Sequence, residues 1–122
     1  ALEYGVGGEV FVPMLPSFKI VDLIETLKEK HNKSNEIKVI GLRPGEKIHE
    51  SMVNPSEISR TYKFKDMYII SSQIEEYVDN LEREYYNEEN KISEGELNDY
   101  SSKDSLVDKE ELSRIFKEFG LL

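Results

Sequence analysis

Two short apolar runs on either side of an amphipathic stretch constrain the fold of this chain more than any other feature. The first run, residues 8–14, is rich in β-branched and aromatic side chains and stops near Pro13, as a buried strand does. Four apolar residues of the next stretch recur at the spacing of one helix face: Ile20, Leu23, Ile24 and Leu27. The second run, residues 37–42, again predicts a strand. This order predicts an α/β fold with a short parallel strand pair, a right-handed crossover and flanking helices.

Local signals predict where this first helix begins and ends. Ser17 is placed to cap its start. Lys28, Lys30 and His31 are placed where cations complement the negative end of a helix.

Further along, residues 54–57 predict a brief helical turn, because Asn54 can cap it, Pro55 suits the first helical position and Glu57 follows three residues after the cap. Residues 60–64 and 67–71 predict short extended segments around Lys65 and Asp66. Residues 73–86 carry apolar residues at helical spacing, and either a helix or an acidic surface excursion fits them.

Residues 73–105 read as a variable acidic insertion, and the polar part from 87 to 105 predicts a solvated loop. Residues 106–120 predict a terminal helix. Asp108 and Glu111 match a capping box, and Val107 and Leu112 hold the positions of a hydrophobic staple. One apolar face follows, made of Leu112, Ile115, Phe116 and Phe119, and Gly120 supplies the stop.

Length and charge limit the functions open to the chain. Its 122 residues predict a single domain, residues 1–122. A net charge of −9 disfavours nucleic acids and anionic membranes, so an anionic ligand must be met by a local basic site. The chain has no cysteine and only two histidines, His31 and His49, so no metal-ligand cluster is expected. No apolar run has the length of a membrane span and no signal peptide is recognisable, so we expect a cytoplasmic protein.

The most informative motif is GLRPGEKIHES, residues 41–51, which follows the second apolar run and precedes a short predicted helix. Arg43 offers a fork of donors suited to a phosphate, and Pro44 with Gly45 predicts a tight turn. Glu46 can accept hydrogen bonds from vicinal ribose hydroxyls, and the start of the helix would add a favourable dipole for an anion. The alternative interpretation is an ordinary surface turn in which Arg43 pairs with Glu46.

Several motifs in register extend this interpretation: GGEVFVPMLPSFKIVDLIETL, IKVIGLRPGEKIHESMV, SRTYKFKDMYII, NDYSS and LVDKEELSRIF. Together they resemble the C-terminal part of the CapD-like polysaccharide-biosynthesis proteins of the extended short-chain dehydrogenase/reductase superfamily. Within these, the chain is most similar to the inverting UDP-N-acetylglucosamine 4,6-dehydratases. The resemblance is weakest over residues 73–98.

The resemblance implies a substrate-binding role. In the complete enzymes an N-terminal Rossmann half holds NADP or NAD and the catalytic residues, and the C-terminal half helps to hold the UDP-sugar. Carried over, Arg43 would contact the pyrophosphate and Glu46 the uridine ribose. Lys47 and Arg60 are second candidates for the same anion, although each fits a plain surface charge better. His49 fits a helix residue without an acid–base role better than a catalytic one.

The chain departs from the complete enzymes in its catalytic parts. The glycines of GVGGEV precede a strand, so they do not form a dinucleotide-binding turn at a helix start, and no tyrosine is followed by lysine at the fourth position. The first residues read as the end of a helix whose earlier turns are missing. We therefore expect a C-terminal fragment that contains no catalytic residue, binds no cofactor and is inactive alone.

Three functions stay open at this stage. The chain can be part of a 4,6-dehydratase, in which hydride leaves sugar C4, water leaves across C5 and C6, and hydride returns at C6. It can be part of a UDP-sugar 4-epimerase, in which hydride returns to C4 on the opposite face. It can also be a non-enzymatic module that forms homo-oligomers through its terminal helix.

Overall fold

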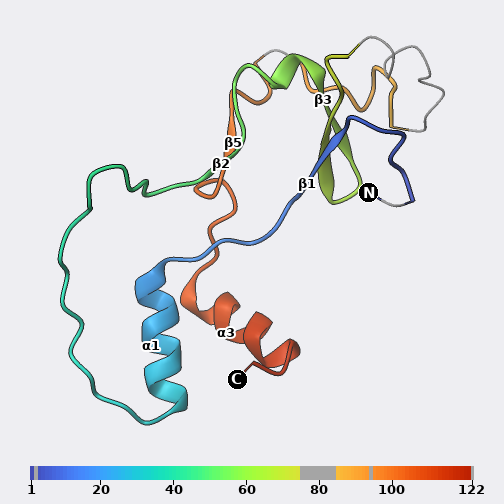
Figure 1. The fold of residues 1–122 in the computed structure, drawn as a ribbon. Helices are drawn as coiled ribbons and strands as arrows, with labels where there is room; N and C mark the ends of the chain where they lie inside the picture. The colour runs from blue at the N-terminus through green and yellow to red at the C-terminus, as the bar shows by residue number, and fades with distance from the viewer. Residues whose placement is uncertain (2, 75–84, 94, 122) are drawn as a thin grey trace. The chain divides into compact units, whose positions relative to one another are not determined.

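The computed structural model describes residues 1, 3–74, 85–93 and 95–121 (Figure 1). The chain divides into two compact units, each built from two separate stretches of sequence. Residues 1–15 and 51–101 contain the strands, and we call them the sheet unit. Residues 16–50 and 102–122 contain the α-helices described, and we call them the helix unit.

All strand pairs described in the sheet unit are antiparallel. β1 (Val10–Pro13) and β3 (Thr61–Phe64) lie on either side of β4 (Met67–Ile70). A second pair joins β2 (Ser51–Val53) to β5 (Tyr100–Ser101). The predicted strand near residues 8–14 is therefore confirmed, but its predicted parallel pairing is wrong, because β1 takes β4 as its neighbour.

Local sequence signals explain the β3–β4 hairpin and the turn before it. The two strands meet at Lys65 and Asp66, where Lys65 adopts a φ of 55°. Upstream, Ser56 N–H donates to Asn54 Oδ1 over 3.1 Å and Asn54 N–H donates to a Glu57 carboxylate oxygen over 3.1 Å. The 3₁₀ turn η1 (Ile58–Arg60) follows. The predicted helical turn and the two extended segments are thus confirmed.

Two clusters of buried side chains form the core of the sheet unit. One gathers Val12, Val53, Ile58, Ile70, Ile92 and Tyr100. The other gathers Phe64, Ile69 and Tyr85. The predicted solvated loop over residues 87–105 is therefore wrong at Ile92 and Tyr100, because both side chains are buried and Tyr100 belongs to β5. The predicted helix over residues 73–86 lies mostly outside the described residues.

The helix unit consists of α1 (Ile20–Lys30) and α3 (Lys109–Glu118), where sequence periodicity predicted helices. The two helices are linked by Lys109, whose ammonium lies 2.5 Å from a Glu29 carboxylate oxygen and 3.4 Å from one of Glu25. Rings from the two chain segments also meet, since Phe18 and Phe116 pack edge to face with centroids 6.0 Å apart. None of the helices described is long and apolar enough to cross a lipid bilayer.

The caps of the two helices differ from each other. Asp108 Oδ1 accepts the Glu111 amide over 2.9 Å, as predicted, whereas the Glu111 carboxylate pairs with Arg114 instead of returning to the cap. Ser17 does not cap α1, because that helix starts later and Lys19 holds the cap position. The Ser17 hydroxyl donates to the Ser102 carbonyl instead, beside a single parallel bridge between Ser17 and Leu106.

Two predicted elements around the RPGEK turn are not formed. Residues 37–42 contain no strand, and residues 46–50 contain no helix. The first prediction fails because a strand needs a neighbouring strand, and residues 37–42 make no backbone hydrogen bond with another described residue. The second fails because the chain continues directly into β2 and has no repeating apolar face to stabilise a helix.

Candidate functional site

The two residues predicted to meet a nucleotide sugar, Arg43 and Glu46, lie at the two ends of one tight turn in the helix unit. The Glu46 amide donates to the Arg43 carbonyl over 3.0 Å and closes the turn. Pro44 and Gly45 hold its middle positions, and Gly45 has a φ of 87°. Proline followed by a residue of positive φ is the arrangement of a type II turn. The predicted tight turn is therefore confirmed.

The side chains of the turn contact each other. One carboxylate oxygen of Glu46 accepts the Arg43 amide over 2.8 Å, and the other lies 3.8 Å from Arg43 Nε. The Arg43 side chain is 75% exposed and that of Glu46 is 47% exposed. The ion pair of the alternative interpretation is thus present. An exposed pair of this kind contributes at most about 1 kcal/mol, so a stronger anionic ligand can displace it.

Charge is unevenly divided between the two units. The sheet-unit residues carry 5 basic and 14 acidic side chains, whereas the helix-unit residues carry 11 of each. The whole net charge of −9 therefore belongs to the sheet unit. Residues 33–47, which contain the turn, carry four basic and two acidic side chains. The turn lies in a locally cationic stretch, so the overall charge does not argue against an anionic ligand there.

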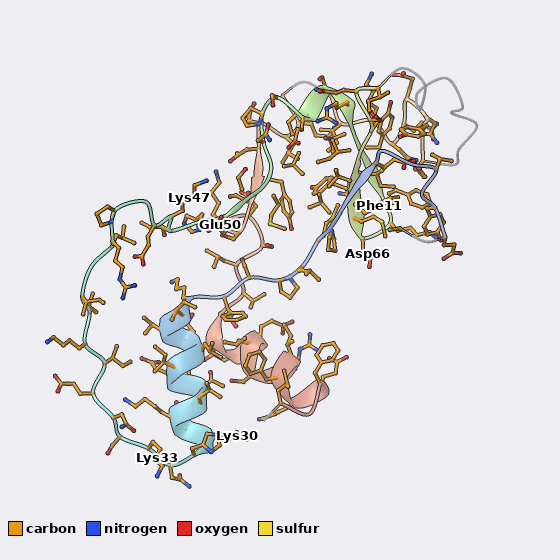
Figure 2. All side chains as sticks on the ribbon, viewed as in Figure 1. Phe11, Lys30, Lys33, Lys47, Glu50 and Asp66 are labelled. Atoms are coloured by element: carbon orange, nitrogen blue, oxygen red, sulfur yellow. The ribbon has the colours of Figure 1, made fainter. Side chains whose placement is uncertain are left out.

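The other candidate residues are placed less favourably for a shared anion site. Lys47 is exposed next to the turn (Figure 2). Arg60 belongs to the sheet unit, where its guanidinium donates to the Ser71 carbonyl and lies 3.5 Å from Glu57. Those contacts give Arg60 a structural role within its own unit. His49 is exposed and lies outside any helix, so its predicted helical position is wrong.

A cavity of about 480 Å³ lies in the helix unit beside His49. Its walls are mainly apolar, and the residues that line it are Ser17, Phe18, Lys19, Ile20, Ile48, His49, Ser102 and Leu106. Ser102 holds one side of it: its hydroxyl accepts the Glu50 amide over 3.1 Å and lies 3.5 Å from His49 Nδ1. Sequence reasoning placed no site here, because Ser102 meets Glu50 and His49 from a distant part of the sequence. Arg43 and Glu46 are not among the lining residues.

The glycine-rich start of the chain does not fit a dinucleotide phosphate. The Val6 and Gly7 amides both donate to the carboxylate of Glu9, over 3.1 and 2.8 Å. A phosphate would need these donors and would meet the negative charge of Glu9. Over residues 1, 3–74, 85–93 and 95–121, no group of three metal-ligating side chains comes together.

Comparison with known families decides the identity. Residues 1–72 match the family model described as "Polysaccharide biosynthesis protein". The chain belongs to this family. The polysaccharide biosynthesis family was the one indicated by the sequence motifs, so that prediction is confirmed.

Two enzymes that this chain resembles are much longer than its 122 residues. An inverting UDP-N-acetylglucosamine 4,6-dehydratase of Campylobacter jejuni is 46% identical over 68 residues, which are 56% of this chain and 19% of the relative. A UDP-glucose 4-epimerase of Rickettsia rickettsii is 39% identical over 70 residues, 57% of this chain and 20% of the relative. The chain thus spans about a fifth of either enzyme.

Two matches extend over nearly the whole chain. A Methanocaldococcus jannaschii protein described as an uncharacterized membrane protein is 34% identical over 95% of this chain and 33% of its own length. The X-ray structure of Pen from Bacillus thuringiensis covers 99% of this chain, with a TM-score of 0.72 and 29% identity, and the match accounts for 33% of Pen. The fold of this polysaccharide biosynthesis protein therefore recurs as one third of a larger chain.

Proposed function

We propose that this polysaccharide biosynthesis protein supplies the UDP-sugar-binding part of a nucleotide-sugar 4,6-dehydratase of surface polysaccharide or glycan biosynthesis. Arg43 binds the pyrophosphate and Glu46 binds the uridine ribose. The observation that carries the proposal is the type II turn, which keeps both side chains exposed and next to each other. The cationic balance of residues 33–47 supports it.

The contacts of the free turn suggest how it receives the ligand. Arg43 Nε lies 3.8 Å from a Glu46 carboxylate oxygen, so this ion pair is loose. A phosphate can replace the carboxylate and accept hydrogen bonds from both donors on one edge of the guanidinium. Glu46 keeps its hydrogen bond with the Arg43 amide, which holds the carboxylate in position. The oxygen released from the guanidinium can then accept from ribose hydroxyls. The turn thus exchanges an internal ion pair for two ligand contacts.

This role is binding without turnover. Hydride transfer through NADP or NAD belongs, in this proposal, to polypeptide beyond these 122 residues, because the glycine-rich stretch is occupied by Glu9. We expect the complete assembly to work in the cytoplasm. A UDP-sugar 4-epimerase would use the same binding step, and we favour the dehydratase because the Campylobacter relative is 46% identical and the Rickettsia relative 39% over similar lengths.

The proposal is tested by titrating UDP into the full chain, with binding followed by calorimetry and by NMR shifts of the Gly45 and Glu46 amides. We expect saturable binding that Arg43→Ala abolishes and Arg43→Lys weakens, because lysine cannot bind a phosphate through two parallel donors. Glu46→Gln should reduce the preference for UDP over 2′,3′-dideoxy-UDP, which lacks the ribose hydroxyls.

Lys38→Ala is the matched control, since Lys38 is an exposed cation of the same stretch outside the turn. It should change UDP affinity by less than about twofold, as expected for a distant screened charge. Equal losses in Lys38→Ala and Arg43→Ala would mean that UDP is held by diffuse charge, and the assigned role of the turn would be wrong. If the isolated chain does not bind, the same titrations on a chimaera in which this chain replaces the matched third of Pen decide the question.

A further inference from the structure

The helix unit exposes an apolar segment, residues 36–42, that has the composition of a buried strand. Val39 is 84% exposed, Ile40 72% and Leu42 63%, and Ile37 is also exposed. Three such side chains in four consecutive positions are unusual at the surface of a water-soluble domain. The apolar segment therefore has the properties of a surface that another polypeptide covers.

The backbone of the apolar segment is also unpaired. Over residues 36–42, no amide or carbonyl makes a hydrogen bond with another described residue. Figure 1 draws this part of the chain as a plain extended trace between α1 and β2. Unpaired donors and acceptors on an extended apolar backbone are the features that allow a strand to join a sheet.

The order of side chains in the segment indicates the kind of sheet. Successive residues of a strand point to opposite faces, so Ile37 and Val39 would share one face, and Ile40 and Leu42 would share the other with Glu36 and Lys38. Over residues 39–42 the segment is apolar on both faces, which suits the part of a sheet that helices cover on both sides. A second copy of this segment would give only a two-stranded ribbon with both faces in water. A second copy is therefore a poor occupant.

The longer relatives have enough polypeptide to supply such a sheet. This chain accounts for 33% of Pen and 33% of the Methanocaldococcus jannaschii protein. About two thirds of each protein thus lies outside the matched region, which is enough for a separate α/β domain.

We propose that residues 36–42 are an insertion strand, which joins the edge of a helix-covered sheet in polypeptide that lies outside these 122 residues. The partner is recognised by main-chain hydrogen bonds along the sheet edge and by apolar surfaces on both faces. This inference does not depend on the ligand role of Arg43 and Glu46.

Hydrogen exchange tests the proposal on two proteins: the full 122-residue chain, and the chimaera in which it replaces the matched third of Pen. In the isolated chain we expect the amides of residues 37–42 to exchange as freely as an unfolded peptide. In the chimaera we expect them to exchange at least about 100-fold more slowly, as amides of a paired strand do. Free exchange of these amides in a folded chimaera would overturn the proposal.

Val39→Pro supplies the second measurement, because proline removes a strand amide and is not tolerated inside a sheet. In the isolated chain it should leave the melting temperature unchanged, since the Val39 amide makes no described hydrogen bond. In the chimaera it should remove the protection of the apolar segment and lower the melting temperature. Ser34→Pro, an exposed site just before the segment, is the control and should do neither.

Two further outcomes would contradict the proposal. Protection of residues 37–42 in the isolated chain that rises with protein concentration, together with a dimer by light scattering, would assign the segment to a second copy. A chimaera that tolerates Val39→Pro as well as Ser34→Pro would show that the segment joins no sheet. Arg43→Ala should lose UDP binding and keep the hydrogen-exchange protection of residues 37–42, whereas Val39→Pro should lose this protection and keep UDP binding. These two results separate this inference from the proposed function.

Discussion

At the scale of single residues, the carboxylate of Glu9 joins two backbone amides to a buried tyrosine. Its oxygens accept from the amides of Val6 and Gly7 and, over 3.0 Å, from the hydroxyl of the buried Tyr85. Partial burial raises the pKa of Glu9, but the hydrogen bonds from Gly7, Val6 and Tyr85 outweigh it and hold the pKa below its ordinary value of 4.5. The carboxylate therefore ties the start of the chain to the core.

We expect Glu9→Gln to lower the free energy of unfolding by about 1–3 kcal/mol at pH 7, because charge-assisted hydrogen bonds are lost. A pKa that is lower in the folded state contributes stability above the ordinary value of 4.5, and this contribution disappears as the pH falls through the lowered pKa. The difference between the two proteins should therefore shrink in acid. Urea unfolding at several pH values measures it, and the exposed Glu3→Gln should show neither effect.

At the scale of elements, those that depend on residues close in sequence were predicted correctly, and those that depend on distant residues were not. The two helices were found because their apolar stripes and the Asp108 cap are written within a few residues of sequence. The RPGEK turn was found because Pro44 fixes its own φ and Gly45 readily adopts the positive φ that the turn needs. The strand at residues 37–42 and the parallel pair could not be predicted correctly, since pairing is decided by distant residues. The role of Ser102 could not be predicted for the same reason, because its hydroxyl accepts a hydrogen bond from the amide of Glu50, which is distant in sequence.

The cap of α3 gives a prediction at this scale. Asp108→Ala should lower the free energy of unfolding by about 1 kcal/mol, because the Glu111 amide loses its acceptor. Asp108→Asn keeps a side-chain oxygen at the cap and should retain most of the stability. Thermal unfolding followed by circular dichroism compares the three proteins. Equal losses in both variants would show that charge, and not the capping hydrogen bond, is responsible.

At the scale of the whole molecule, the two units have separate sets of core residues. Both clusters described for the sheet unit consist of its own residues, and Leu112 is a buried residue of the helix unit. Leu112 is 1% exposed, so Leu112→Ala should lower the free energy of unfolding by about 2–5 kcal/mol. We expect hydrogen exchange to accelerate in α1 and α3 and to stay unchanged in β1 and β4.

Phe119 provides the control for this prediction, because it follows the same helix and is 72% exposed. Phe119→Ala should change stability by no more than about 0.5 kcal/mol in the isolated chain. If Leu112→Ala accelerates exchange equally in β1 and β4, the two units unfold as one cooperative body.

The division of each unit between two stretches of chain has a consequence for synthesis. The backbone passes from one unit to the other after Leu15, after Glu50 and after Ser101. On a ribosome, β1 emerges long before β4, and α1 long before α3, so neither core can close early. The apolar face of α1 stays open while the entire second stretch of the sheet unit is translated. The nascent chain is therefore expected to expose this apolar face until α3 has been translated.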